Sequence, residues 1–180
     1  MNAFIEILKK ANEQKWCVKQ FCTTCGSRQF RDELQKLGEE LGGPLADALS
    51  ELVPRELMEI ENWEDALFIA IYDLPIRGFV VEDLLKNWLS KLNENIYFAD
   101  VILYKIVKLL PNTNEMRKEW IEKCIKLALE KKHFSLTESL ILVLGRDGLN
   151  YAPLIEQAKE FAKTSEQMKR VLLNACNLKI

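Results

Sequence analysis

Three cysteines near the start of this 180-residue chain have the spacing that most suggests chemistry. Cys17, Cys22 and Cys25 form a Cys-x4-Cys-x2-Cys pattern, and Gly26 follows the third cysteine. A Cys-x-x-Cys-Gly turn aims two thiolates at one metal ion, and the glycine relieves crowding after the second ligand. The spacing therefore makes Cys17, Cys22 and Cys25 candidate ligands of a zinc ion, within a cysteine-containing loop over 15–27.

Two other interpretations of these thiols stay open. The cysteines could be free, reduced structural thiols, or they could take part in redox chemistry, since Cys-x-x-Cys motifs of cytosolic proteins serve both purposes. The Cys-x-x-Cys-Gly piece resembles a zinc knuckle, but a zinc ribbon has a second such pair, which this chain lacks. The whole spacing also matches the first three ligands of plant-type 2Fe–2S ferredoxins, whose β-rich fold is not expected here. A fourth ligand would be Cys124, Cys176, His133, a carboxylate or water.

The single histidine, His133, limits the enzyme classes that the chain can belong to. A Ser–His–Asp triad would have to use it, and a multi-histidine metal centre is excluded. Phosphate-binding loops of the Gly-x4-Gly-Lys-Ser/Thr and Gly-x-Gly-x2-Gly types are absent. Because His133 follows Lys131 and Lys132, we expect it at a helix C-terminus, where the helix dipole favours positive charge. The sequence predicts a protein that is not an enzyme, with no catalytic residues.

Acidic residues concentrate in one stretch of the chain. Residues 28–83 hold 14 Asp and Glu against five Lys and Arg, although the whole chain has a formal net charge of only −2. The densest block of carboxylates comprises Glu51, Glu56, Glu59, Glu61, Glu64 and Asp65. One interpretation is the solvated face of short helices. The other is a contact surface for a basic protein partner, in which the acids steer the encounter and Trp63 or Met58 is the anchor.

Helices must position these residues, because apolar residues recur at helical intervals along most of the chain. Caps and breakers divide the chain into about ten short helices joined by turns. The predicted helix starts are Asn2, Ser27, Asn62, a capping box at 135–138, and Thr164-Ser-Glu-Gln167. The apolar run 66–72 is predicted to be a central helix rather than a buried strand. Gly145 is predicted to end the helix that the capping box at 135–138 opens. The fold class is all-α, in a single domain over 1–180.

Successive helices pair at intervals of roughly 30 to 40 residues, which is the spacing of helical-repeat solenoids. The stretch 139–155 resembles a HEAT-type repeat junction, because Leu144-Gly145 ends one helix and Ala152-Pro153-Leu154 opens the next. The resemblance implies short helices packed as an α-α superhelix or HEAT-like solenoid. Such folds usually present an elongated surface to another macromolecule, which favours a binding protein over an enzyme.

Composition and hydropathy further limit the classes of protein to which the chain can belong. Hydrophobic residues make up 48% and charged residues 29%, as in a folded globular chain. No apolar run approaches the roughly 18 residues of a membrane span. Glu6 interrupts the apolar start, so a signal peptide is not expected. The acidic balance argues against a general nucleic-acid binder. We therefore expect a cytoplasmic protein without disulfides, membrane contacts or nucleic-acid partners.

The stretch from Trp16-Cys17 to Phe30-Arg31 and the helical plan resemble immunity proteins of bacterial toxin systems, particularly contact-dependent growth inhibition. The resemblance implies tight binding to one cognate toxin, often a nuclease, by occlusion of its active or substrate-binding surface. An acidic protein suits a nuclease because the nuclease face that holds phosphate is basic. The alternatives are a HEAT-like protein–protein scaffold or adaptor, and a HEAT-like DNA glycosylase with a carboxylate beside Trp63. The glycosylase requires a basic groove, and the only basic excess is spread over 84–180.

Overall fold

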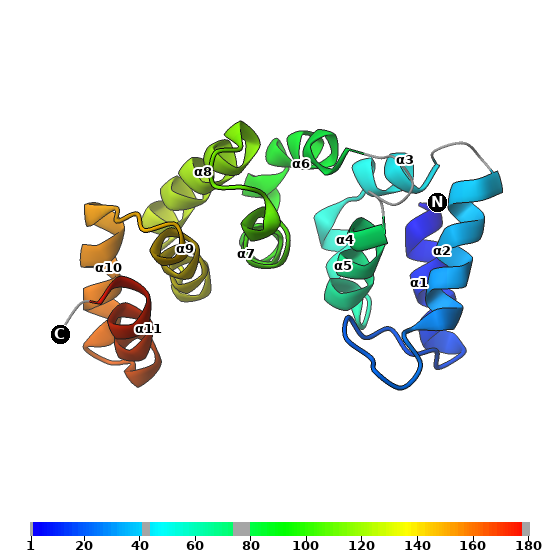
Figure 1. Ribbon diagram of the computed structural model, residues 1–180, viewed down its shortest axis with the longest axis horizontal. Coiled ribbons are helices and arrows are strands. Elements are labelled where there is room, and N and C mark those ends of the chain that lie inside the picture. The colour runs from blue at the N-terminus through cyan, green and yellow to red at the C-terminus, as the bar shows by residue number, and fades with distance from the viewer. Residues whose placement is uncertain (1, 41–43, 74–79, 178–180) are drawn as a thin grey trace. The chain divides into compact units, whose positions relative to one another are not determined.

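The structure is a computed structural model that describes residues 2–40, 44–73 and 80–177. These residues form helices, turns and loops with no strand among them, which confirms the all-α fold (Figure 1). They divide into two compact units, Met1–Glu94 and Asn95–Ile180, which are described one at a time. The organisation as a single domain stays a prediction. Across the described ranges, every helix is too short or too polar to span a bilayer.

Six α-helices and one short 3₁₀ helix make up the described part of the first unit. They are α1 (Ala3–Glu13), α2 (Arg28–Glu40), α3 (Pro44–Ser50), α4 (Pro54–Met58), α5 (Trp63–Asp73), α6 (Val81–Leu89) and η2 (Leu92–Glu94). Helices α1, α2 and α3 pack against one another, α5 contacts α2, and α6 contacts α3 (Figure 1). Their shared core is apolar because each helix buries one stripe of side chains. Its fully buried side chains include Phe4, Leu8, Phe30, Leu34 and Leu49.

Polar groups of α6 and the following turn hold the end of α3 in place. Trp88 is fully buried, and its indole N–H donates a hydrogen bond to the carbonyl of Leu49 at 2.8 Å. The amino group of Lys91 donates to the carbonyls of Ser50 and Leu52, both at 2.8 Å. These donors bind carbonyls at the C-terminal end of α3 and in the turn that follows it, where intrahelical N–H partners are few.

The second unit is a set of stacked helices in two layers. It contains α7 (Ile96–Lys105), η3 (Val107–Leu109), α8 (Glu115–Lys131), α9 (Phe134–Arg146), α10 (Ala152–Ala162) and α11 (Glu166–Cys176). Helix α9 is central and packs on α7, α8, α10 and α11, while α8 also contacts α10 (Figure 1). Neighbours in the sequence, and helices two apart, are therefore in contact, as expected for helical hairpins that stack on one another.

A buried ion pair joins two of these hairpins. Arg117 of α8 is 1% exposed, and its guanidinium donates two hydrogen bonds to the carboxylate of Asp147, at 2.6 and 2.7 Å. The same guanidinium donates to the carbonyls of Lys108 at 2.8 Å and Leu110 at 2.5 Å. Asp147 lies in the predicted junction between α9 and α10. This turn is therefore held by an ion pair with the preceding hairpin, and no local sequence pattern predicts that pairing.

The predicted helix caps were only partly right. Asn2 caps α1, since its side-chain oxygen accepts from the backbone N–H of Phe4, and Ser165 caps α11 by accepting from Met168. The predicted capping box at 135–138 is wrong. Helix α9 begins at Phe134, and the Nδ1 atom of His133 accepts the N–H of Leu136 at 3.3 Å. His133 follows the C-terminal end of α8 at Lys131 and Lys132, as predicted, and it is also the N-cap of α9, which was not predicted.

The hydroxyl of Ser135, predicted to be a cap, has a different role. Ser135 and Ser139 both donate hydrogen bonds to the carboxylate of Asp100 on α7. Asp100 is 9% exposed, so these hydroxyls stabilise a carboxylate that is largely shielded from water. The pattern Ser-x-x-Glu was therefore misread because the serine is satisfied by a tertiary contact.

Gly145 does not end α9, which continues to Arg146. A Cβ atom at Gly145 would lie 2.3 Å from the carbonyl oxygen of Ala175 on α11, so the glycine allows the two helices to approach closely. The turn after α9 instead uses Gly148, whose φ of +70° is in the left-handed region. The apolar run 66–72 is part of α5, as predicted.

Candidate functional site

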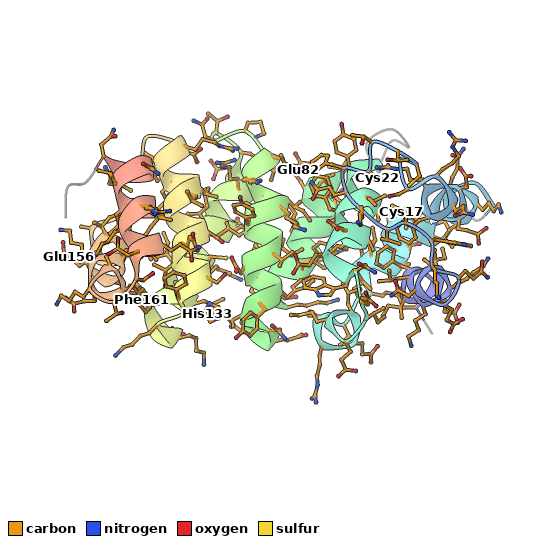
Figure 2. All side chains as sticks on the ribbon, turned by 90° about the horizontal axis from the view of Figure 1, so that it is seen from below. Cys17, Cys22, Glu82, His133, Glu156 and Phe161 are labelled. Atoms are coloured by element: carbon orange, nitrogen blue, oxygen red, sulfur yellow. The ribbon has the colours of Figure 1, made fainter. Side chains whose placement is uncertain are left out.

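The cysteine-containing loop connects α1 to α2 and is tied to the first unit at both ends. Helix α1 ends where Lys15 adopts a φ of 55°, and the N–H of Trp16 returns to the carbonyl of Ala11 at 2.8 Å. Val18 is 3% exposed and anchors the loop in the core. The loop therefore leaves α1 in a defined direction (Figure 2 labels Cys17 and Cys22 on it).

Ser27 holds the other end of the loop. It was predicted to cap α2, but its 1% exposed hydroxyl reaches back across the loop instead. It donates to the carbonyl of Lys19 at 2.9 Å and accepts the N–H of the same residue at 3.1 Å. Its hydroxyl oxygen also lies 3.7 Å from the sulfur of Cys17. Ser27 thus brings the first cysteine next to the turn that carries the other two.

Cys22 and Cys25 lie on a tight turn that has the features of a metal-binding knuckle. The N–H of Gly26 donates to the carbonyl of Cys22 at 3.0 Å, and the N–H of Cys25 points at the sulfur of Cys22 at 3.4 Å. Gly26 has a φ of +61°, which favours glycine at this position. The guanidinium of Arg31 donates to the carbonyl of Gly26 at 3.0 Å, which fixes the turn to α2.

The three thiols lie close enough together to hold one metal ion. All pairs of sulfur atoms among Cys17, Cys22 and Cys25 are within 4.8 Å, and the Cys22 and Cys25 sulfurs are 3.1 Å apart. Sulfur atoms bound tetrahedrally to one zinc ion are about 3.8 Å apart, since each Zn–S bond is about 2.3 Å. The Cys22–Cys25 separation is about 0.7 Å below that value, and no pair is more than about 1 Å above it. Small side-chain movements would therefore bring all three onto one ion.

Within the described residues, the cluster offers three protein ligands and no fourth. The other residues that the sequence left open as ligands belong to the second unit. Cys124 is fully buried in its core, and burial, with the nearby Asp100 carboxylate adding to it, raises the pKa of its thiol to about 12. Cys176 is half-buried on α11, and burial raises its pKa as well. His133 uses Nδ1 as a helix cap.

The thiols of Cys22 and Cys25 differ in acidity because Cys25 donates a hydrogen bond to the sulfur of Cys22. The hydrogen bond from the Cys25 thiol, with smaller contributions from the Cys25 and Thr24 backbone and the Cys17 thiol, lowers the pKa of Cys22 to about 6. The same contact with Cys22 raises the pKa of Cys25. Cys22 is therefore the thiolate of the pair near neutral pH, which is the form that binds metals and reacts with electrophiles.

A hollow of about 350 Å³ lies beside the cluster. It is lined by Cys17, Thr24, Cys25, Ser27, Arg28 and Gln29. Two of the three thiols therefore face a space large enough for a water molecule or a small side chain. A ligand from outside the loop has access to a metal ion at this position.

The predicted acidic surface is largely exposed, and it surrounds the short helix α4 and the start of α5. Five of its carboxylates are exposed and that of Asp65 is half-buried; the five are Glu51, Glu56, Glu59, Glu61 and Glu64. In the part of the chain that the structure describes, Glu51, Glu56, Glu59 and Glu61 form no ion pair. Glu56 and Glu59 also border a second hollow of about 350 Å³, together with Lys9 of α1.

Trp63 does not have the position expected of an anchor for a partner. It is 9% exposed, because the first turn of α5 directs its indole into the core of the first unit. A partner would reach little of this ring without unfolding the helix. Met58 is half-buried at the end of α4. The apolar contribution to any interface here must come from other residues.

The sequence analysis did not predict one group of aromatic residues, which lies on α5 and on the cysteine loop. Phe21 of the cysteine loop contacts Phe68 of α5, with ring centres 6.1 Å apart, and Phe68 stacks on Tyr72 at 6.0 Å. Phe21 and Tyr72 are 81% and 61% exposed. The signal in the sequence was the four-residue spacing of Phe68 and Tyr72 within an apolar run. Nothing in the sequence placed Phe21 beside them.

The chain was compared with known proteins by family model, by sequence and by structure, and no family model, curated protein or solved structure matched it.

Proposed function

We propose that this chain is an immunity protein that binds a basic toxin domain, such as a nuclease, and neutralises it by covering its active or substrate-binding surface. The observation that supports this proposal is the set of exposed carboxylates around α4, at Glu51, Glu56, Glu59 and Glu61, which form no ion pair within the described residues. The mechanism is steric and electrostatic occlusion, and it requires no turnover.

Several exposed carboxylates of the second unit differ from those around α4, because they form ion pairs with lysines. Exposed carboxylates on the last two helices have lysine partners three residues later: Glu156 with Lys159, Glu160 with Lys163, and Glu166 with Lys169. Among the described residues, Glu51, Glu56, Glu59 and Glu61 have no such partners, so their charge is not neutralised by a neighbouring lysine. Charges of one sign gathered on one surface accelerate association with a partner of the opposite sign and exclude partners of the same sign.

The first experiment identifies the partner and tests the surface. The tagged full chain is used as bait in a lysate of its native host, and the affinity of the protein that co-purifies is then measured at two salt concentrations. The test variant changes Glu56, Glu59 and Glu61 to Lys. The matched control changes Glu156 and Glu160 to Lys, because those carboxylates already have lysine partners.

The proposal requires a stoichiometric basic partner, a clear loss of affinity in the test variant, and a weaker salt dependence of what remains. Unchanged affinity and salt dependence in the test variant would rule out this surface as the interface. Recovery of several housekeeping proteins would instead indicate a scaffold or adaptor.

The cysteine loop supports a second proposal, that the chain holds a structural zinc ion through Cys17, Cys22 and Cys25. The supporting observations are the sulfur separations within 4.8 Å and the N–H of Cys25 directed at the sulfur of Cys22. An ion bound there would cross-link the loop and restrict its movement.

Protein purified without chelator should contain about one zinc ion per chain. The Cys22→Ser variant should lose it, whereas Cys176→Ser, which changes a thiol of the second unit, should keep it. Less than about half an equivalent of metal in the unmodified protein would contradict the proposal.

A further inference from the structure

Three aromatic rings form a continuous exposed row on the first unit. Phe21, Phe68 and Tyr72 are linked by ring-centre distances of 6.1 and 6.0 Å. The outer two rings expose 81% and 61% of their surface, and Phe68 between them is half-buried. Single exposed apolar residues are common, but three adjoining rings form a patch, and patches of this kind mark interaction sites.

The position of Phe21 does not follow from packing needs within the unit. The loop already has Val18 as its core anchor, and Ser27 closes it through two hydrogen bonds with Lys19. Phe21 nevertheless lies on the surface of α5 against Phe68 while most of its ring stays in water. A ring that is held against a neighbouring ring and is 81% exposed can contact a partner with little further ordering.

The row is continuous with acidic residues. Glu64, Phe68 and Tyr72 are spaced four residues apart on α5, so they lie along one face of the helix. The segment 61–73 contains four acidic residues and no basic residue, and the loop contributes Lys15 and Lys19. An apolar centre with a charged margin is the usual composition of a protein interface.

The charge and the ring faces together specify the chemistry of the partner. Carboxylates attract cations, and the faces of aromatic rings carry partial negative charge that also attracts them. Arginine is the cation that suits both, because its planar guanidinium stacks on rings and pairs with carboxylates. A lysine ammonium is more strongly hydrated and gains less from a ring face.

We propose that Phe21, Phe68 and Tyr72 form the contact centre for a cationic protein segment, with an arginine guanidinium of the partner stacked on the row and held by the neighbouring carboxylates. This inference rests on the proposed function and deepens it, because it gives the acidic surface the apolar anchor that the buried Trp63 does not supply. It also gives the cysteine loop a role in binding, since Phe21 precedes Cys22.

The test uses the full chain and a fluorescent 12-residue peptide of alternating arginine and glycine, with anisotropy as the measure of binding. Phe21→Ala and Tyr72→Ala each remove one ring; because both rings are mostly exposed, the variants should fold, which circular dichroism checks. Tyr72→Phe keeps the ring. The matched control is Tyr151→Ala, which removes an exposed ring from the second unit.

Each ring removal should weaken binding of the arginine peptide by about two- to five-fold. Tyr72→Phe and Tyr151→Ala should leave affinity unchanged, and the matching lysine peptide should bind more weakly than the arginine peptide.

Two results would overturn the inference. In the first, Phe21→Ala and Tyr72→Ala bind the peptide as tightly as the unmodified chain, whereas the double variant Glu56→Lys, Glu59→Lys binds it more weakly. The aromatic row is then not the contact centre, and the acidic surface remains the proposed interface. If neither set of variants changes binding, or the peptide does not bind at all, the acidic surface fails together with the row.

Discussion

The thiol of Cys22 should react as a thiolate at a pH where ordinary cysteines do not. Hydrogen bonding from Cys25 lowers its pKa from 9.0 to about 6. The charged form is therefore present above pH 6 and is lost as the pH falls through that value. The perturbation is pH itself, applied to metal-free protein, and the quantity measured is the rate of alkylation at Cys22.

Two opposing effects set the size of the difference. At pH 6 about half of Cys22 is thiolate, against about 0.1% of a thiol with a pKa of 9.0. A thiolate of lower pKa is intrinsically less nucleophilic, and three pKa units reduce its rate constant by about 15- to 30-fold. Cys22 should thus react about 20-fold faster than in the unfolded chain at pH 6, and the advantage should vanish between about pH 7 and 8.

The assay is a short pulse of iodoacetamide at a series of pH values, followed by peptide mapping to identify the alkylated cysteine. Native and urea-unfolded protein are compared at each pH. Buried Cys124 is an internal control and should stay unmodified in the native protein, because burial raises its pKa to about 12. The Cys25→Ala variant removes the main cause of the shift, so the midpoint for Cys22 should rise toward the ordinary value.

A midpoint for Cys22 near pH 9 in the native protein would refute this reasoning, since it would mean that the Cys25 thiol does not donate to it in solution. A low midpoint that persists in Cys25→Ala would refute only the assigned cause.

Three further outcomes concern the second unit and are measured by chemical unfolding. Arg117→Met should lower the free energy of unfolding by about 3–5 kcal/mol, because it leaves the carboxylate of Asp147 buried without the Arg117 guanidinium. The double variant with Asp147→Leu should recover most of that stability. An Arg117→Met variant that unfolds at the same denaturant midpoint as the unmodified chain would contradict this prediction. Gly145→Ala should cost about 1–3 kcal/mol despite a better helix propensity, since its Cβ meets the backbone of Ala175, and a stabilised variant would show that the two helices separate easily. His133→Ala should cost about 0.5–2 kcal/mol through loss of the cap on α9, whereas His133→Asn, which retains a capping acceptor, should cost less.

Much of the helical plan followed from local sequence, because helix formation depends on apolar spacing and on residues within a few positions of the helix ends. Asn2 caps the first helix by accepting the N–H of Phe4, two residues away, and Ser165 caps the last by accepting that of Met168, three residues away. The apolar run 66–72 is predicted to be helical because the chain offers no partner strands, and it lies in α5. The cysteine cluster was also predictable, since Cys22 and Cys25 belong to one four-residue turn.

Errors arose wherever a side chain is satisfied by a residue distant in the sequence. Ser135 was predicted to cap a helix, but it donates to Asp100, 35 residues earlier. Ser27 was predicted to do the same, but its hydroxyl closes the cysteine loop. Local pattern does not distinguish these cases, because a serine hydroxyl satisfies a nearby N–H and a distant acceptor equally well.

Composition and local spacing are sufficient to predict the all-α class, most helix positions, the acidic stretch and the grouping of three cysteines, since each depends on neighbours in the chain. Which of these features face solvent depends on how the helices pack. The tertiary structure buries Trp63, exposes Phe21 beside Phe68, and pairs Arg117 with Asp147. Those outcomes depend on the packing of helices far apart in the sequence, where burial and desolvation decide whether a ring is core or surface and whether a charge needs a partner.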